Sequence, residues 1–191
     1  AVALGFAGAG IGLDPGQEGA GTSAGDVERA KQIALDLDLA GKVRFEQKTF
    51  GDLLADGTSE RYSLIVFRNS LHHIYERNAD RAIDLSVTEQ CVKDLISLQR
   101  LLSDDGVLYI LEATRAPFAV AKLSDLYRRS KGVGPIGWDD KRTKPEWIDL
   151  LRAAGFRSTV SANRPYNKWI GNPIIRSVGK RMSAQFTVAA R

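Results

Sequence analysis

The sequence predicts an α/β fold built on a mostly parallel sheet. Apolar runs at residues 63–67 and 107–111 alternate with amphipathic helical patterns, and strands separated by helices are typical of parallel pairing. The two runs lack the polar alternation of half-exposed strands, so we expect burial on both faces. With 191 residues, of which 43% are hydrophobic, the chain is large enough for one compact domain.

Amphipathic patterns predict the helices between these strands. The first helix covers residues 26–41, with Asp26 as its cap and Gly41 at its end. Its apolar stripe consists of Ala30, Ile33, Ala34 and Leu37. A strand is expected at residues 42–45. The next marked helix runs roughly over residues 87–102 and stops at Asp104-Asp105-Gly106. Its inner side is made by Val92, Leu95, Ile96 and Leu102.

The last third of the chain departs from the simple alternation of strands and helices. Residues 116–142 combine a weak helical pattern with a Gly- and Pro-bearing loop, which we interpret as a cover over the strand ends. Thr143, with Glu146 three residues later, forms a capping box that predicts the last helix. Its buried stripe consists of Trp147, Leu150, Leu151 and Ala154, before Gly155.

Two alternating segments close the chain. Residues 156–161 and 184–190 read as strands, and the residues between them are too many for a tight hairpin. We therefore expect residues 163–183 to form a loop that touches a substrate or a partner domain. The whole of residues 1–191 is interpreted as a single domain, either a fragment or an excised domain of a larger protein.

Charge and cysteine content bound the class of protein. The formal net charge is +4, but basic and acidic residues are interleaved until Asp149, after which no acidic residue follows. We interpret the basic end as a solvated face, and no nucleic-acid partner is predicted. Cys91 is the only cysteine, so an internal disulfide is excluded and a cytoplasmic location fits. No apolar stretch is long enough to predict a membrane span.

Two short segments carry the main functional signal. Asn69-Ser-Leu-His72-His73 follows one buried run, and Leu111-Glu112-Ala-Thr-Arg115 ends the next. Because ligands of α/β folds lie at the carboxyl ends of parallel strands, an imidazole and a carboxylate are expected at the same edge. The structural alternative is that His72 only caps the strand end and Glu112 is an exposed loop carboxylate. His73 is expected to point away from the site.

These two segments, in this order, resemble a class I S-adenosylmethionine-dependent methyltransferase. The pattern continues with a Pro-Glu-x-Trp-like helix, Ala-Gly-Phe and two closing strands, and the resemblance covers about residues 10–191. Within that superfamily the chain is most similar to the C-methyltransferase domains of polyketide synthases and nonribosomal assembly lines. The resemblance implies a Rossmann-like sheet that is mostly parallel, with an antiparallel C-terminal strand.

The resemblance also implies that His72 and Glu112 form a catalytic dyad. Methylating carbon requires an electron-rich carbon, and a base produces one by removing a proton between a ketone and a thioester. Histidine suits this step because its ordinary pKa lies near the working pH. Glu112 would hold the imidazole in the correct tautomer. Asn69 either contacts the methionine end of S-adenosylmethionine or only stabilises the turn.

The cofactor elements at the start of the chain allow two alignments. In the first, residues 10–14 are the second strand of the family and Asp14 binds the ribose, so the first strand and its glycine loop lie outside this chain. In the second, Gly10 and Gly12 belong to that glycine loop. Spacing favours the first. Thr49 stands where many relatives place an adenine-binding Asp, with Glu46 and Asp52 as substitutes.

Three functions are therefore left open. The favoured one is C-methylation of an acyl-thioester, carried on a carrier protein among the domains of a megasynthase. The second is a methyltransferase-like domain that has lost methyl transfer and serves as a scaffold or an epimerase. The third is an O-methyltransferase for small molecules. Only the first and third require S-adenosylmethionine for the reaction.

Overall fold

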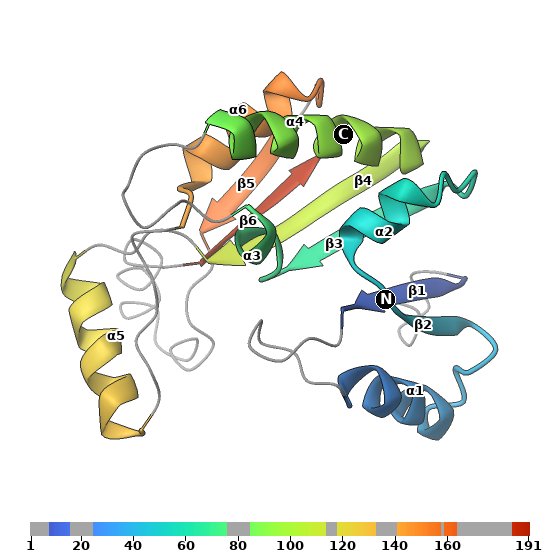
Figure 1. The fold of residues 1–191 in the computed structure, drawn as a ribbon, viewed down its shortest axis with the longest axis horizontal. Helices are drawn as coiled ribbons and strands as arrows, with labels where there is room; N and C mark the ends of the chain where they lie inside the picture. Colours follow the sequence, from blue (N-terminus) through green and yellow to red (C-terminus); the bar gives the residue numbers. More distant parts are fainter. Residues whose placement is uncertain are drawn as a thin grey trace. The chain divides into compact units, whose positions relative to one another are not determined.

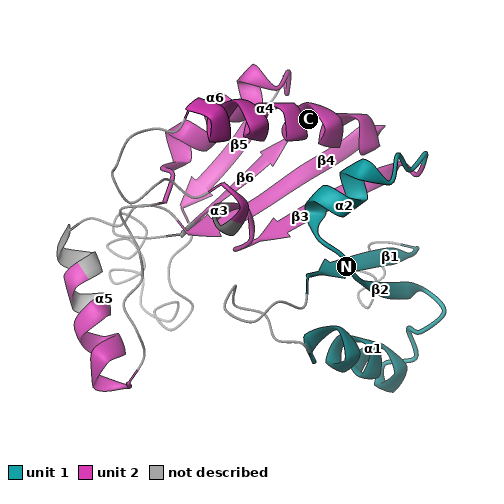
Figure 2. Cartoon of the chain, viewed as in Figure 1, with its two compact units in different colours: residues 1–59 teal, residues 60–191 magenta. Residues whose placement is uncertain are grey.

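The chain forms two compact units, residues 1–59 and residues 60–191 (Figure 2). The computed structural model describes residues 8–15, 25–75, 85–113, 118–132, 141–157, 159–163 and 185–191. Its helices and strands alternate along most of the chain, as the sequence predicts (Figure 1).

The first unit contains a parallel strand pair. Strands β1 (Gly10–Asp14) and β2 (Val43–Gln47) pair in parallel and are separated in the sequence by helix α1 (Asp26–Asp36). A short helix, α2 (Phe50–Ala55), follows β2. This strand, helix and strand order matches the first alignment above. The second alignment is wrong, because Gly10 and Gly12 lie within a strand and not in a loop.

Helix α1 begins differently from the prediction. Gly25 occupies the capping position without any side-chain hydrogen bond, and Asp26 is already helical. The carboxylate of Asp26 instead lies in the first turn, where the helix dipole favours negative charge. The inner stripe is also narrower than expected, because Ile33 is 52% exposed while Val27 and Ala34 are buried. Two strands offer a helix a smaller apolar surface than a wide sheet does, so fewer of the helix side chains are buried.

The second unit contains a mixed sheet of four strands in the order β3-β4-β6-β5. These strands are β3 (Tyr62–Arg68), β4 (Leu102–Ala113), β6 (Gln185–Ala190) and β5 (Thr159–Asn163). Strands β3 and β4 run parallel, whereas β6 runs antiparallel to both β4 and β5. The expectation of an antiparallel C-terminal strand is thus confirmed.

Helices α4 (Leu85–Leu101) and α6 (Lys144–Ala153) pack on one face of this sheet and on each other (Figure 1). The capping box of Thr143 and Glu146 is confirmed, since each residue bonds the backbone N–H of the other. Side chains from both helices and from the central strands make the core. Its largest fully buried apolar members include Trp147, Phe186, Leu95, Leu98, Leu108, Ile110, Leu151 and Val188.

Two expectations for this sheet are wrong. Strand β3 is not buried on both faces, because Leu64 is 44% and Val66 is 54% exposed. Among the described residues of this unit, α4 and α6 cover the other face. The predicted turn at Asp104-Asp105-Gly106 lies inside β4, which starts directly after α4. The register of β4 with β3 shifts in this segment, as at a β-bulge.

The remaining helices lie near the expected functional regions. Helix α3 (Leu71–Ile74) follows β3, and helix α5 (Phe118–Ser130) falls within the predicted cover at residues 116–142. The predicted loop at residues 163–183 lies outside the described residues apart from Asn163. In the part of the chain that the structure describes, no helix is long and apolar enough to cross a membrane.

Candidate functional site

The carboxyl ends of β3 and β4 bring the two functional segments together. Arg68 lies opposite Leu111 in this parallel pair, so Asn69 and Glu112 follow at the same edge of the sheet. The backbone N–H of Asn69 extends the ladder by donating to the carbonyl oxygen of Leu111, with an N···O distance of 2.7 Å. The expected juxtaposition of the two segments is therefore confirmed for the backbone.

Asn69 turns the chain away from the sheet. Its φ of 51° lies in the left-handed region, which asparagine tolerates better than most side chains. Its side-chain Oδ1 atom is buried and accepts no hydrogen bond from any residue that the structure describes. A buried carbonyl oxygen without a donor is costly, so this atom fits a ligand that carries an N–H group.

Glu112 holds the turn that follows. The side chain is fully buried, and its Oε1 atom accepts hydrogen bonds from the backbone N–H groups of Ser70, at 2.8 Å, and Leu71, at 2.7 Å. These bonds occupy donors at the start of α3, where the side chain of Ser70 makes no capping bond. The alternative of an exposed loop carboxylate is wrong.

His72 and His73 lie within the backbone of α3. Their side chains are outside what the structure describes. His72 follows directly after Leu71, whose N–H is bound by Glu112. The carboxylate is thus placed to orient the turn that carries the histidine, while a direct contact between the two side chains stays a prediction.

The other predicted cofactor residues lie in the first unit. Gly10, Gly12 and Asp14 belong to β1, where Gly10 donates its N–H to the carbonyl oxygen of Lys42 at 2.8 Å. Asp14 is the last residue of the strand and lies opposite Gln47. This is the position that the first alignment requires of a ribose-binding acid, and that role stays a prediction.

Gly12 has a structural reason of its own. A Cβ atom at this position would lie 2.6 Å from one ring carbon of Phe45 and 2.8 Å from another. Such distances are far below normal carbon contacts. Glycine is therefore required for the close approach of the Phe45 ring to β1, whether or not a ligand binds there.

We expect Gly12→Ala to destabilise the protein by about 1–3 kcal/mol, because the new methyl group overlaps the Phe45 ring. Thermal unfolding should show the loss. Gly41→Ala is the matched control, since a Cβ at position 41 meets nothing within 4 Å and should leave stability nearly unchanged. The penalty should shrink in a Phe45→Leu background. An undiminished penalty in that double variant would contradict the steric explanation.

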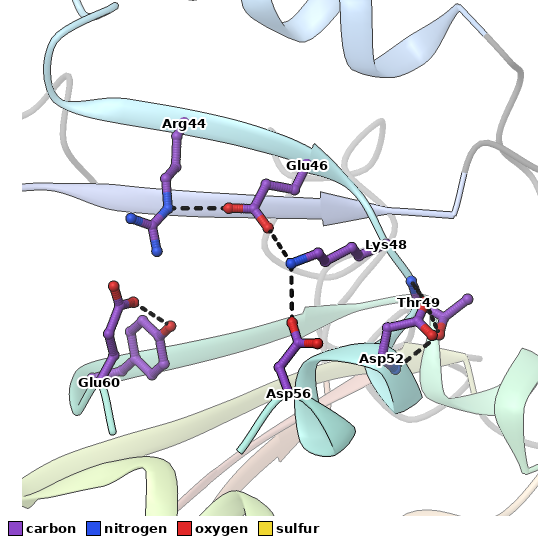
Figure 3. A network of polar contacts seen from close by, with 8 residues as sticks. Arg44, Glu46, Lys48, Thr49, Asp52, Asp56 and Glu60 are labelled. Atoms are coloured by element: carbon purple, nitrogen blue, oxygen red, sulfur yellow. Dashed lines mark hydrogen bonds and ion pairs between the residues drawn. The ribbon is translucent and has the colours of Figure 1, made fainter. Parts of the chain in front are cut away.

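Thr49 caps helix α2. Its hydroxyl accepts from the backbone N–H of Asp52 at 3.1 Å and donates to the carboxylate of Asp52 at 2.7 Å, and that carboxylate also accepts from the N–H of Thr49 at 2.8 Å (Figure 3). These bonds hold the pKa of Asp52 below its usual value. The Thr-x-x-Asp signal was present in the sequence, and it predicts a cap. Adenine recognition by Thr49 stays a prediction.

Glu46 and Asp52, the substitutes for adenine recognition, have partners of their own. Lys48 bridges β2 to the end of α2 through contacts of 3.0 Å to both Glu46 and Asp56 (Figure 3). The hydrogen bonds to these carboxylates, with Glu46 first, raise the pKa of Lys48. Glu46 also pairs with Arg44 at 3.3 Å. This exposed network ties β2 to α2 and leaves Glu46 engaged on the protein surface.

A buried polar contact at the end of α3, where Tyr75 caps the helix, was not predicted from the sequence. The Tyr75 hydroxyl donates to Asp94 of α4 at 2.6 Å. Burial and, to a smaller extent, this hydrogen bond raise the pKa of Tyr75.

Cys91 lies on α4, about one helical turn before Asp94, and is fully buried. Burial raises the pKa of its thiol to about 12, so Cys91 is protonated at neutral pH. Burial of this kind is typical of a structural cysteine and not of a nucleophile.

Comparisons with known proteins support the fold at low sequence identity. No family model matches the chain, and no curated protein matches it. An O-methyltransferase family protein from Burkholderia thailandensis superposes with a TM-score of 0.54 at 16% identity and covers 99% of this chain and 52% of its own. The CurJ carbon methyltransferase gives 0.54 at 17% identity, covering 94% and 40%. DhpI, solved as a complex with SAH, gives 0.53 at 16% identity, covering 98% and 67%.

The chain spans about half the length of the solved structures that it matches, between 40% and 67% in these three cases. At sequence identities of 16–17%, these matches show that the folds are similar and say nothing of individual side chains. The chain therefore has a mixed α/β fold similar to that of S-adenosylmethionine-dependent methyltransferases.

Proposed function

We propose that the chain is an S-adenosylmethionine-dependent C-methyltransferase that acts on the activated α-carbon of an acyl-thioester. The observation that carries the proposal is the shared edge of β3 and β4, where Asn69 and Glu112 frame the turn that bears His72. A methyltransferase needs a base and a cofactor contact within one small region, and this edge offers candidates for both. The CurJ carbon methyltransferase has a similar fold, so the fold is compatible with carbon as the acceptor.

The residues at this edge fit the cofactor in one respect that can be tested. The Oδ1 atom of Asn69 is buried without a donor among the described residues, and the α-ammonium of S-adenosylmethionine is a donor of suitable charge. In the first unit, Asp14 at the end of β1 is a separate candidate, which the family resemblance proposes for the ribose hydroxyls. When bound, S-adenosylmethionine supplies an electrophilic methyl group.

The chain's own residues would prepare the acceptor carbon. His72 would take a proton from the carbon between a ketone and a thioester, which leaves an enolate as the nucleophile. Glu112 would favour the protonated imidazole that results, and its bonds to Ser70 and Leu71 hold the histidine turn in place. Positioning of the enolate supplies much of the remaining acceleration. A carrier protein and neighbouring megasynthase domains would present the substrate.

A domain that has lost methyl transfer is the second candidate. Thr49, Glu46 and Asp52 all engage in local caps or ion pairs, which weakens the case for adenine recognition in the first unit. Such a domain could still use His72 for proton transfer alone, as an epimerase does. An O-methyltransferase shares the fold, as the Burkholderia thailandensis protein illustrates, and it differs in the substrate atom that accepts the methyl group.

Titration with S-adenosylmethionine separates these candidates. We expect the wild type to bind, and we expect Asn69→Gly to raise Kd about tenfold, which corresponds to about 1.4 kcal/mol for one lost hydrogen bond. Glycine retains the left-handed backbone at this position and removes only the side chain. Calorimetry measures both constants.

Asn69→Asp is the matched control, since it keeps an acceptor oxygen and should bind at least as well as the wild type. An Asn69→Gly variant with unchanged affinity would contradict the role of Asn69. A wild type that binds no S-adenosylmethionine would rule out methyl transfer by this chain and favour the second candidate. Methylation of a β-keto thioester compared with a phenol then distinguishes carbon from oxygen as the acceptor.

A further inference from the structure

Arg142 is a buried cation that the methyl-transfer proposal does not use. It lies just before α6, next to Lys141, and each of the two residues is only 6% exposed. Guanidinium groups are rarely buried to this extent without a carboxylate or another anion beside them. The partners of Arg142 are therefore informative.

The described residues give Arg142 a single hydrogen bond and no ion pair. Its Nη2 atom donates to the hydroxyl oxygen of Thr88 in α4 at 3.2 Å. Its Nε atom is buried and has no acceptor in the described part of the chain. A neutral hydroxyl orients the side chain, but it does not compensate the charge.

Two carboxylates on the packed helices, those of Asp94 and Glu146, are already engaged. Asp94 acts with Arg142 on the Cys91 thiol, whose pKa Arg142 lowers and Asp94 raises. The two oxygens of Asp94 accept from the Tyr75 hydroxyl at 2.6 Å and from Gln90 at 2.8 Å. Glu146, in the first turn of α6, is bonded to Thr143 in the capping box.

Helix α6, which begins at Lys144, carries a second donor in this condition. The Nε1 atom of Trp147, in a side chain that is 1% exposed, is also buried without an acceptor among the described residues. An unpaired buried charge and an unpaired buried N–H group both destabilise a folded protein. For each donor, an acceptor outside the described residues is a simple physical explanation.

We propose that Arg142 is the anchor of an anion-binding site that takes a carboxylate or phosphate oxyanion of a ligand. Arginine is suited to this role because its planar fork matches both groups. Thr88 holds the guanidinium from α4, and the oxyanion accepts from the Nε side of the fork. The site does not depend on methyl transfer, and its test does not require activity.

Thermal unfolding in the presence of inorganic phosphate or malonate tests the site. Each anion is compared with sodium chloride at the same ionic strength. We expect phosphate or malonate near ten times its Kd to raise the Tm of the wild type by about 4 °C. A response to phosphate alone identifies a phosphate ligand, a response to malonate alone identifies a carboxylate ligand, and a response to both identifies a general oxyanion site.

Arg142→Gln should abolish this rise. Arg152→Gln is the matched control, since Arg152 is an exposed arginine of α6 that pairs with Asp149 at 3.4 Å. This variant should respond like the wild type. Should Arg142→Gln fail to fold, Thr88→Ala gives a second measurement. It keeps the guanidinium but removes the one partner that the described residues offer it, and it should halve the rise. A wild type indifferent to both anions, or a rise that persists undiminished in Arg142→Gln or Thr88→Ala, overturns the proposal.

Discussion

Replacing His72 with alanine is expected to lower kcat for methyl transfer by about 10²- to 10⁴-fold, the range that a general base contributes. The reason is that no enolate forms without a group to accept the proton. Folding and the affinity for S-adenosylmethionine should change little, because the start of α3 is held by the bonds of Glu112 to the backbone of Ser70 and Leu71. Steady-state kinetics, unfolding and cofactor titration measure the three quantities.

His73→Ala is the matched control for this variant. The two histidines are neighbours in the same short helix, so both substitutions make the same change in helix propensity and in net charge. We expect His73→Ala to retain most of the activity. Near-normal turnover of His72→Ala would exclude His72 as the base, and an equal loss in both variants would indicate damage to the helix instead.

Replacing Glu112 with alanine is expected to lower the free energy of unfolding by about 2–5 kcal/mol. The substitution leaves two N–H groups of the α3 turn without their acceptor in a buried place, and each such group costs about 1–3 kcal/mol. Because Glu112 is fully buried, solvent screening does not reduce the effect. Chemical denaturation measures the loss, and amide hydrogen exchange at Ser70 and Leu71 should accelerate.

Glu112→Gln separates the two roles of this side chain. Glutamine keeps a carbonyl oxygen that can accept from both N–H groups, so most of the stability should return. The negative charge that would favour a protonated His72 is lost, so the activity should stay low and its pH profile should shift to lower pH. A glutamine variant with full activity would limit Glu112 to holding the turn.

Local sequence patterns predicted those features that local physics decides. The Thr143 capping box lies within one helical turn, so its two hydrogen bonds follow from the residue types and their spacing. The shared edge of β3 and β4 followed from their parallel pairing. Thr49 and Asp52 form the same kind of capping box within one turn of α2, and their spacing alone is enough to predict it. Adenine recognition by Thr49, which rests on the family resemblance, stays a prediction.

Features that depend on distant packing could not be predicted in this way. An apolar run cannot report which of its faces is covered, so the exposure of Leu64 and Val66 was not visible in the sequence. The two bonds of Glu112 join residues 41 and 42 positions apart, a separation at which periodicity carries no signal. The buried state of Arg142 likewise depends on how α6 packs against α4.

The bonds between Glu112 and the start of α3 have a consequence for the order of folding. A helix of four residues cannot persist by its own propensity, and its first donors are satisfied by a strand that the ribosome makes some forty residues later. The histidine turn should therefore take shape only once β4 has docked beside β3. A nascent chain that stops short of β4 would contain His72 but not the ordered turn that positions it.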